Sequence, residues 1–465
     1  MTLHDQDQET STDEYVAVRP QFARSGELER VPRNRLPDTS MDADTAYQIV
    51  HDELALDGNA RLNVATFVTT WMEPQARQLI ADTLDKNMID KDEYPQTAIL
   101  ENRCVRMLAD LWHAPDALHA VGTSTIGSSE AAMLGGLALK WRWRERRRAE
   151  GKPTDKPNLV MGVNVQVCWD KFCRYWDVDP VLVPMEAGRY FLTAEEAAKH
   201  CDENTIGVVA VLGSTQEGSF EPVAEIADAL DRHERDTGVS VPIHVDAASG
   251  GFIAPFLDPH LEWDFRVPRV QSINTSGHKY GLVYPGVGWA VWRDEEALPD
   301  ELVFKVNYLG GETPTMALNF SRPGAQIVAQ YYSFLRLGRT GYTEVQSACR
   351  QTARWLAQGV AGLGHFELIS DGSQLPVFTF RLQDGIENYT VYDLADHLRQ
   401  RGWLVPSYSF PPNLEHMDVI RIVVRNGFSH DMGRFLLRDI RETIERFDRL
   451  ESPLPRVSDT SAFHH

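Results

Sequence analysis

Short apolar runs alternate with amphipathic segments through the middle of the chain. The apolar runs are bounded by glycine, proline and polar residues, whereas the segments between them repeat apolar residues at helical spacing. This alternation predicts an α/β domain with a mostly parallel sheet. The strands predicted for this sheet are Leu159–Gly162, Val181–Val183, Thr205–Leu212, Val241–Asp246, Arg269–Thr275 and Gly286–Trp292.

The regions on either side of this alternation predict further elements. Before it, the spacing of apolar residues predicts helices over Asp42–Leu54, Pro74–Asn87 and Asp92–Trp112. Small residues dominate Val121–Glu130, which predicts a turn that opens a long helix. After it, a small α+β unit is expected, with helices over Gln326–Leu337, 342–362, Val391–Arg401 and Asp431–Phe447 and strands at Phe366–Ile369, Val377–Leu382 and Val419–Arg425.

These patterns divide the chain into four expected parts. They are an N-terminal arm with a helix (1–62), a large domain (63–344), a small C-terminal domain (345–450) and a tail (451–465). The first part of the arm is polar and carries scattered prolines. We expect such a segment to be mobile or to wrap around a partner.

Composition narrows the range of functions. The formal net charge of −21 at pH 7 argues against a general nucleic-acid binder and against binding to an anionic membrane surface. No apolar run is long enough for a transmembrane helix, and the polar, acidic start is unlike a signal or transit peptide. The five cysteines are odd in number and lack C-x-x-C spacing, which favours a reducing cytoplasm and no metal site.

A lysine is the centre of the predicted chemistry. Lys279 lies in Ser276–Gly281, among small and aromatic residues, just after an apolar strand. A lysine that acts as a nucleophile needs surroundings of low polarity to lose its proton. Asp246 ends another strand, and the carboxyl ends of parallel strands form a ligand crevice. Together they predict a Schiff base between Lys279 and pyridoxal phosphate (PLP), with the Asp246 carboxylate at the pyridinium nitrogen.

Other residues suit the remaining parts of this cofactor. Ser128 and Ser129 open the long helix, whose free N–H groups form an anion site for a phosphate. On this motif alone, a simple serine cap is the stronger explanation. Ser276 and His278 flank the lysine and would complete the phosphate cradle. The expected contacts of the ring are Ala248 below it and Gln166 above it.

Six motifs occur in order along the chain: Asn63–Phe67, Asp90–Pro95, Gly127–Glu130, His244–Gly251, Ser276–Gly281 and Asn319–Pro323. Together they resemble the glutamate decarboxylases of bacteria and plants. The likeness extends over residues 40–450, in order and without large gaps. It implies the α/β fold of type I PLP-dependent transferases, in which a large domain with a mostly parallel seven-stranded sheet is followed by a small C-terminal α+β domain.

The resemblance also implies a role for each site residue. The catalytic residues would be Lys279, Asp246 and His278. The cofactor would be held by Ser128, Ser129, Gln166, Thr215, Asp246, Ala248, Ser276, His278 and Lys279, and by Phe320 and Ser321 from a neighbouring subunit. Thr66 and Asp90 would contact the distal carboxylate of glutamate, and Phe67 would line the pocket. Arg421 would bind the α-carboxylate.

The implied reaction converts L-glutamate to 4-aminobutanoate and carbon dioxide and consumes a proton. The Arg421 guanidinium can hold the α-carboxylate perpendicular to the cofactor ring through two hydrogen bonds. Asp90 would face a second carboxylate, and two such groups in contact cannot both be ionised. One of them must hold a proton, which predicts an activity favoured by acid. Because the implied reaction consumes a proton, enzymes of this kind can buffer a cytoplasm under acid load.

The tail and the assembly are further expectations from the resemblance. The chain ends in Phe463-His-His465, similar to tails that close the site at neutral pH in acid-tolerance members. His465 would be the regulatory group, and a disordered end is the alternative. A homo-oligomer is expected, at least a dimer and alternatively a hexamer. The basic, tryptophan-bearing helix with which plant members bind calmodulin is missing.

Two other functions remain open on the sequence alone. Another PLP enzyme, such as a decarboxylase of a different amino acid, a carbon–carbon lyase or a transaminase, would also need Lys279 and Asp246. Gln166 and the Asn63–Phe67 motif favour glutamate. A protein of the same fold that binds a partner without catalysis would be expected to lack Lys279 or Asp246, and both are present.

Overall fold

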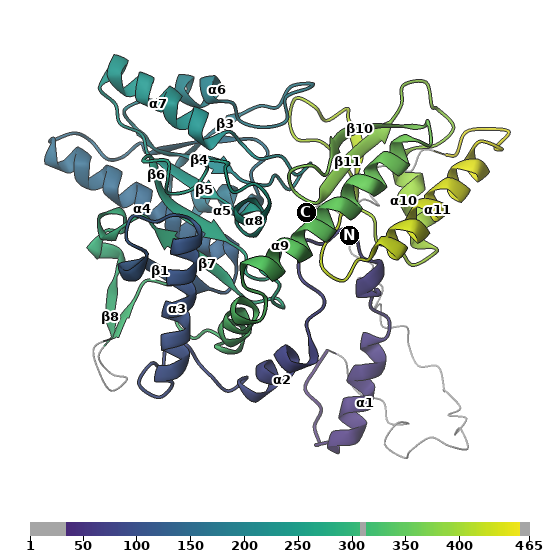
Figure 1. The fold of residues 1–465 in the computed structure, drawn as a ribbon, viewed down its shortest axis with the longest axis horizontal. Helices are drawn as coiled ribbons and strands as arrows, with labels where there is room; N and C mark the ends of the chain where they lie inside the picture. Colours follow the sequence, from purple (N-terminus) through teal and green to yellow (C-terminus); the bar gives the residue numbers. More distant parts are fainter. Residues whose placement is uncertain (1–33, 307–312, 456–465) are drawn as a thin grey trace.

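Two larger sheets, each with its own helices, form the body of the chain (Figure 1). The structure is a computed structural model that describes residues 34–306 and 313–455. The long helix α9 (Ala325–Ala361) runs between the two sheets. Helix α1 (Ala43–Leu54) projects from the body at the lower edge of the view.

The larger sheet has seven strands in the order β1–β7–β6–β5–β4–β2–β3. The neighbours from β6 to β3 are parallel, whereas β7 and β1 are antiparallel to the strands beside them. The mostly parallel, seven-stranded sheet expected from the sequence is therefore confirmed. The strands are β1 (Val121–Thr125), β2 (Asn158–Gly162), β3 (Asp179–Val183), β4 (Thr205–Val211), β5 (Ile243–Asp246), β6 (Val270–Thr275) and β7 (Gly288–Trp292).

Helices cover this sheet because its central strands are apolar on both faces. Every residue of β4 and of β5 is buried, which is typical of parallel strands with helices on either side. Helix α4 packs across β1, β4, β5, β6 and β7. The helices of this part are α2 (Pro74–Asp82), α3 (Pro95–Leu111), α4 (Ser128–Ala149), α5 (Val167–Tyr175), α6 (Ala194–Lys199), α7 (Val223–Thr237) and α8 (Ala254–Leu257).

The smaller sheet has four antiparallel strands in the order β10–β11–β13–β12. Its core, which includes Phe378, Phe380 and Ile420, is separate from the core of the larger sheet. The small C-terminal α+β unit expected from the sequence is thus present, while its exact bounds stay a prediction. The elements are β10 (Phe366–Asp371), β11 (Val377–Leu382), β12 (Ser407–Ser409), β13 (Asp418–Val423), α10 (Val391–Arg399) and α11 (His430–Phe447).

Several local predictions differ from the structure. Val121–Thr125 is a strand and not a turn, because it pairs with β7 and its Ser124 hydroxyl donates to the buried Glu101 carboxylate at 2.5 Å. The helix that begins at Pro74 ends at Asp82, short of the predicted Asn87. The short strands β8 (Phe304–Val306), β9 (Thr313–Thr315) and β12 have no clear sequence signal.

Helix α9 combines two helices that the sequence predicts separately. Its path is broken at Gly338, which has a φ of 55°. Glycine adopts this left-handed conformation without steric cost, so the chain can change direction there. The first half of α9 packs on α2 and α3, and the helix then continues to β10 and α11 of the small unit. The kink therefore lets one helix serve both units.

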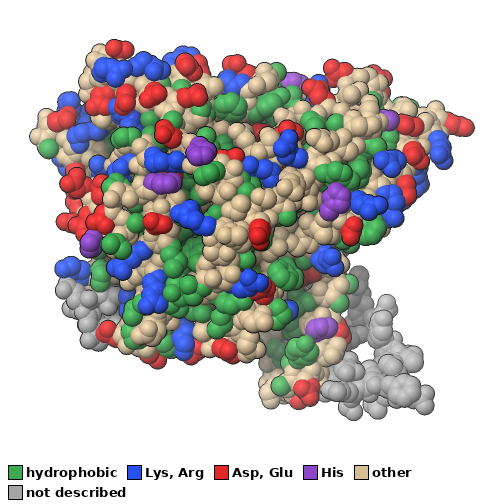
Figure 2. Space-filling view, in the orientation of Figure 1, with side chains coloured by type: hydrophobic (Ala, Val, Ile, Leu, Met, Phe, Trp, Pro, Cys, Tyr) green, Lys and Arg blue, Asp and Glu red, His purple; other side chains and the backbone are tan. Residues whose placement is uncertain are grey.

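The surface carries charges of both signs. Figure 2 shows acidic and basic side chains interspersed over one face, although the whole chain carries a formal charge of −21. Within the described residues, no helix has the length and apolar character required to cross a membrane.

Candidate active site

The candidate site lies at the carboxyl ends of two neighbouring central strands. Asp246 is the last residue of β5, and Lys279 follows β6 in the turn that leads to β7. In the register of these strands, Asp246 stands opposite Asn274. The carboxyl edge of a parallel sheet is the usual position of ligand sites in α/β proteins. The structure therefore brings the two principal predicted residues to the expected edge.

Lys279 is partly buried. Its Nζ lies 3.3 Å from Ser249 Oγ and 5.2 Å from the centre of the Phe67 ring. Burial lowers the pKa of Lys279, and the nearby Asp246 carboxylate partly opposes that shift. An amine with a lowered pKa has a larger neutral fraction and is a better nucleophile. Thr69 fixes the backbone of the turn, because its hydroxyl donates to the Lys279 carbonyl at 2.6 Å.

The Asp246 carboxylate is buried and accepts three hydrogen bonds. Oδ1 accepts from Asn274 Nδ2 at 3.0 Å and from the Ala248 backbone N–H at 3.1 Å. Oδ2 accepts from Trp169 Nε1 at 2.8 Å. Both oxygens of the Asp246 carboxylate thus act as hydrogen-bond acceptors, and their position is fixed. The arrangement suits a group that must keep a ring nitrogen protonated.

The amino terminus of α4 has the features that an anion site requires. No side chain caps this helix, so the N–H groups of its first turn are available to a ligand. A Cβ on Gly127 would lie 3.0 Å from the His278 ring, which places His278 beside the helix start. The Ser276 hydroxyl is buried and has no hydrogen-bond partner within the described chain. Ser128 and Ser129 are the first two residues of the helix.

His278 is held as a neutral hydrogen-bond donor. Its Nδ1 accepts from the backbone N–H groups of Gly286 and Val287 at 3.4 and 3.3 Å. With Nδ1 as the acceptor, the proton of the neutral ring is on Nε2. Burial, followed by the charge of Lys279, lowers the pKa of His278 to about 4. The ring can therefore donate one hydrogen bond, which suits a phosphate oxygen.

Arg421 joins three separate segments at the site. From strand β13, its Nη1 donates to the Thr215 carbonyl at 2.6 Å and its Nη2 to the Ala65 carbonyl at 2.8 Å. The guanidinium carbon lies 4.9 Å from the centre of the Phe67 ring, which Lys279 also approaches. Its Nε is buried without a partner within the described residues. A further donor is thus available for a substrate carboxylate.

A second group of predicted residues is assembled elsewhere. Asn87 Nδ2 donates to Ser321 Oγ at 3.3 Å, and the Met88 N–H donates to the Arg322 carbonyl at 2.9 Å. Asp90 lies in the same turn, because its N–H donates to the Asn87 carbonyl. None of the hydrogen bonds described for Asp90 or Ser321 leads to Lys279. Asp90 therefore groups with Phe320 and Ser321.

Two further predicted residues have local roles in the structure. The side-chain Oε1 of Gln166 caps helix α5 by accepting from the Cys168 N–H at 2.6 Å. Thr66 Oγ1 accepts from the Val68 N–H at 3.1 Å. Their predicted contacts with the ring and with the distal carboxylate stay predictions. His465 lies outside the described residues.

Sequence reasoning missed four residues that surround the main pair. Ser249 contacts the lysine amine, and Trp169 and Asn274 donate to Asp246. His244 in turn contacts Asn274. The sequence does carry a signal for His244 and Asn274. Each is a polar residue at an alternate position of a buried strand, and alternate positions share one face of the sheet. The tryptophan and the serine depend on tertiary packing alone.

The residues present fit PLP. The orphaned Ser276 hydroxyl and the uncapped α4 terminus suit a phosphate, the Asp246 carboxylate suits a pyridinium nitrogen, and the Lys279 amine suits an aldehyde carbon.

Comparisons with known proteins agree with this geometry. Residues 37–383 match the family model of the pyridoxal-dependent decarboxylase conserved domain. A glutamate decarboxylase of Aliivibrio fischeri is 53% identical over 440 residues, 94% of either chain. One of Solanum lycopersicum is 52% identical over 93% of this chain and 87% of its own.

Solved structures agree as well. A glutamate decarboxylase of Lactobacillus brevis has a TM-score of 0.89 at 48% identity, covering 93% of this chain and 99% of its own. A sphingosine-1-phosphate lyase of Burkholderia pseudomallei, with a TM-score of 0.76 and 21% identity over 91% of this chain and 95% of its own, shares the fold alone. The predicted fold class and PLP cofactor are thus confirmed, and the chain belongs to the glutamate decarboxylases of the pyridoxal-dependent decarboxylase family.

Proposed function

We propose that this chain decarboxylates L-glutamate to 4-aminobutanoate. The observation that carries the proposal is the grouping of Lys279, Phe67 and Arg421 above the carboxyl edge of the sheet, with Asp246 behind them. The family likeness, at about half identity with glutamate decarboxylases of a bacterium and a plant, supports glutamate as the substrate.

Separate residues would bind separate parts of the cofactor and of the substrate. Lys279 would hold PLP covalently, Asp246 would accept from its ring nitrogen, and the α4 terminus with Ser276 and His278 would bind its phosphate. When bound, PLP supplies an electron sink for the pair that is left when carbon dioxide departs. Arg421 would hold the α-carboxylate so that the bond to be broken is oriented for this.

Specificity for glutamate would come from the distal carboxylate. Thr66 and Phe67 lie on the segment that Arg421 contacts through Ala65, so they are well placed for a substrate that reaches past Arg421. Asp90 would share a proton with the distal carboxylate, because two ionised carboxylates in contact repel each other. Since Asp90 groups with Ser321, we propose that it reaches this carboxylate from a neighbouring subunit.

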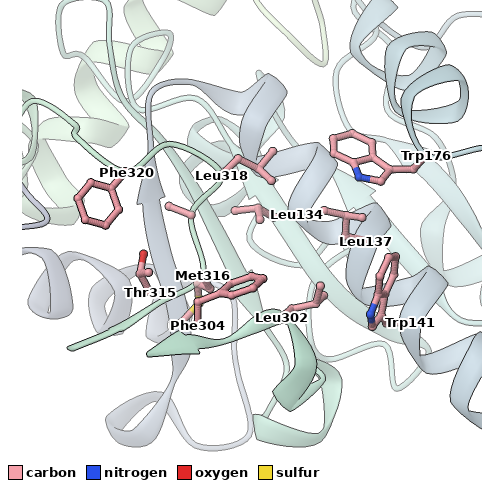
Figure 3. A pocket seen from close by; sticks show the side chains of 11 residues that line it. Leu134, Leu137, Trp141, Trp176, Leu302, Phe304, Thr315, Met316, Leu318 and Phe320 are labelled. Atoms are coloured by element: carbon pink, nitrogen blue, oxygen red, sulfur yellow. The ribbon is translucent and has the colours of Figure 1, made fainter. Parts of the chain in front are cut away.

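We further propose that the chain acts as a homo-oligomer, at least a dimer. An apolar groove of about 410 Å³ lies beside the Ser321 segment (Figure 3). Phe304, Leu318 and Phe320 at this groove are 64%, 45% and 42% exposed. A second copy is the occupant we propose, since Phe320 and Ser321 would complete its cofactor site. The cytoplasm is the proposed compartment.

The activity is tested by carbon dioxide release from a panel of amino acids, and by 4-aminobutanoate formation from glutamate, between about pH 4 and pH 8. We expect turnover of glutamate and an absorbance band near the visible edge that the Lys279→Ala protein lacks. Turnover of an aromatic amino acid, or transamination in place of carbon dioxide release, would support one of the other PLP reactions. A cofactor band without any turnover would support the non-catalytic alternative.

The assembly is tested by sedimentation of the Phe304→Asp protein. We expect this change to dissociate the oligomer, because it places a charge in an apolar interface. Phe435→Asp is the matched control, since Phe435 is 48% exposed on α11 of the other unit. A wild-type monomer, or an unchanged oligomer in the Phe304→Asp protein, would contradict the proposed interface.

A further inference from the structure

A chain of buried polar side chains extends behind the Asp246 carboxylate. Ser272 Oγ lies 2.7 Å from His244 Nδ1, and His244 Nε2 lies 2.7 Å from Asn274 Oδ1. Asn274 Nδ2 then donates to Asp246 Oδ1 at 3.0 Å. His244 and Asn274 are completely buried, and Ser272 is 2% exposed. This series of hydrogen bonds therefore runs through the sheet interior and reaches the candidate site at Asp246.

The strand register produces this chain. His244 and Asp246 are alternate residues of β5, and Ser272 and Asn274 are alternate residues of β6. His244 pairs with Ser272, and Asp246 with Asn274. Alternate residues of a strand share one face, so the four side chains form a polar ladder on one face of the sheet. A slip of one residue would abolish it.

The direction of each hydrogen bond in the chain is fixed by Asp246. An ionised carboxylate only accepts, so the NH₂ group of Asn274 must face it and the amide oxygen must face His244. The His244 proton is therefore on Nε2, and Nδ1 accepts from the Ser272 hydroxyl. Burial lowers the pKa of His244, which agrees with a neutral ring.

The packing around His244 leaves its ring no alternative position. A Cβ on Gly135 of α4 would lie 2.3 Å from His244 Cε1, so only glycine allows the helix to pass so close to the imidazole. On another side, the Trp169 ring meets the imidazole edge-on at 5.2 Å. The same Trp169 donates to Asp246 Oδ2. Trp169 and Asn274, which donate to the two oxygens of the carboxylate, therefore both contact His244.

We propose that Ser272, His244 and Asn274 are positioning residues for the Asp246 carboxylate. They keep the Asn274 amide turned so that it donates to Oδ1, which fixes the plane of the carboxylate toward the ring nitrogen of PLP. The inference rests on the proposed role of Asp246. A buried ladder that only joins β5 to β6 would affect every ligand of the site equally.

The test compares two cofactors that differ at the ring nitrogen. Apoprotein prepared from the holoenzyme is titrated with PLP and with the analogue that has carbon in place of this nitrogen, and both dissociation constants are measured. For Asn274→Leu we expect PLP to bind about tenfold more weakly, the effect of losing one hydrogen bond to a charged group. The affinity for the analogue should not change, because it offers no pyridinium to the carboxylate.

Variants of His244 test the same proposal without the Asn274→Leu change. His244→Leu should weaken PLP selectively in the same way, since the Asn274 oxygen loses its donor. His244→Gln should restore much of the PLP affinity, because its amide N–H can take the place of Nε2–H. Ser272→Ala should have an effect in the same direction. If Asn274→Leu does not fold, the two His244 variants decide between the outcomes.

A control asparagine separates positioning from general damage. Asn158 is also buried, and it donates to Asp202 and accepts from Thr205 at the other end of the sheet. Asn158→Leu should leave the ratio of the two dissociation constants at its wild-type value. Equal weakening of PLP and analogue in the Asn274 and His244 variants would overturn the proposal. A wild-type protein that binds both compounds equally well would instead refute the role of Asp246, whatever its activity on glutamate.

Discussion

Glu217 is a buried carboxyl group whose charge should govern stability against pH. It is 4% exposed in the loop between β4 and α7. Its Oε2 accepts from the Ser219 N–H at 3.0 Å, and its Oε1 from the Ser219 hydroxyl. Burial raises the pKa of Glu217 to about 7, and hydrogen bonds from Ser219 and Ser214 only partly oppose this. Glu221 is buried nearby, and burial also raises its pKa to about 7.

The sign of the pH dependence follows from proton binding. Between pH 4.5, the ordinary value for glutamic acid, and about pH 7, the folded chain keeps a proton on Glu217 that the unfolded chain has lost. The free energy of unfolding therefore falls as pH rises through this window. Over the whole window, the free energy of unfolding falls by about 3 kcal/mol for one such group, at about 1.4 kcal/mol per pH unit. Glu221 adds a second contribution in the same window.

Glu217→Gln imitates the protonated form at every pH, so it removes one of the two contributions. The assay is the urea midpoint or melting temperature of wild type and variant at about pH 5 and about pH 8. We expect the two proteins to be similar in acid and the variant to be more stable in base. Glu195→Gln, at an exposed position of α6, is the control. If wild type and Glu217→Gln lost stability equally between the two conditions, the reasoning would be refuted.

Three further predictions concern the proposed reaction. Arg421→Lys keeps the charge but loses the paired donors, so kcat/KM for glutamate should fall about 10- to 100-fold, as measured in steady state. Asp90→Asn should flatten the preference for acid in the pH–rate profile, and an unchanged profile would rule out the shared proton. Deletion of residues 452–465 should leave activity above about pH 6 higher than in the full chain if His465 closes the site. Equal activity of both chains there would exclude such a closure.

The central pair of the site could be predicted because its signals are local. Lys279 and Asp246 each follow an apolar strand, and the ends of parallel strands converge whatever the details of packing. The strand β1 could not be found in this way, since its small and polar residues become a strand only by pairing with β7. Local composition favours a turn there, but the pairing with β7 makes this segment a strand.

The residues that surround this pair are far from it in the sequence, so no local pattern predicts their contacts. Asn274 reaches Asp246 across 28 residues, and Trp169 reaches it across 77. Whether two polar residues on neighbouring strands meet depends on the register, and a shift of one position would separate them. Likewise, the resemblance gives Asp90 and Ser321 separate roles. Their shared location is evident from the hydrogen bonds by which Asn87 and Met88 link the two segments.

The position of Arg421 depends on how the two units pack. It belongs to β13 of the small sheet, but its guanidinium is held by carbonyls of Ala65 and Thr215, which belong to the rest of the chain. The Thr215 loop is itself fixed from the small unit, since Thr379 Oγ1 and Tyr408 OH both donate to the Gln216 carbonyl. A shift between the units would move Arg421 relative to Lys279. If Arg421 binds the α-carboxylate as proposed, the contacts that join the two units would also orient the bond to be broken.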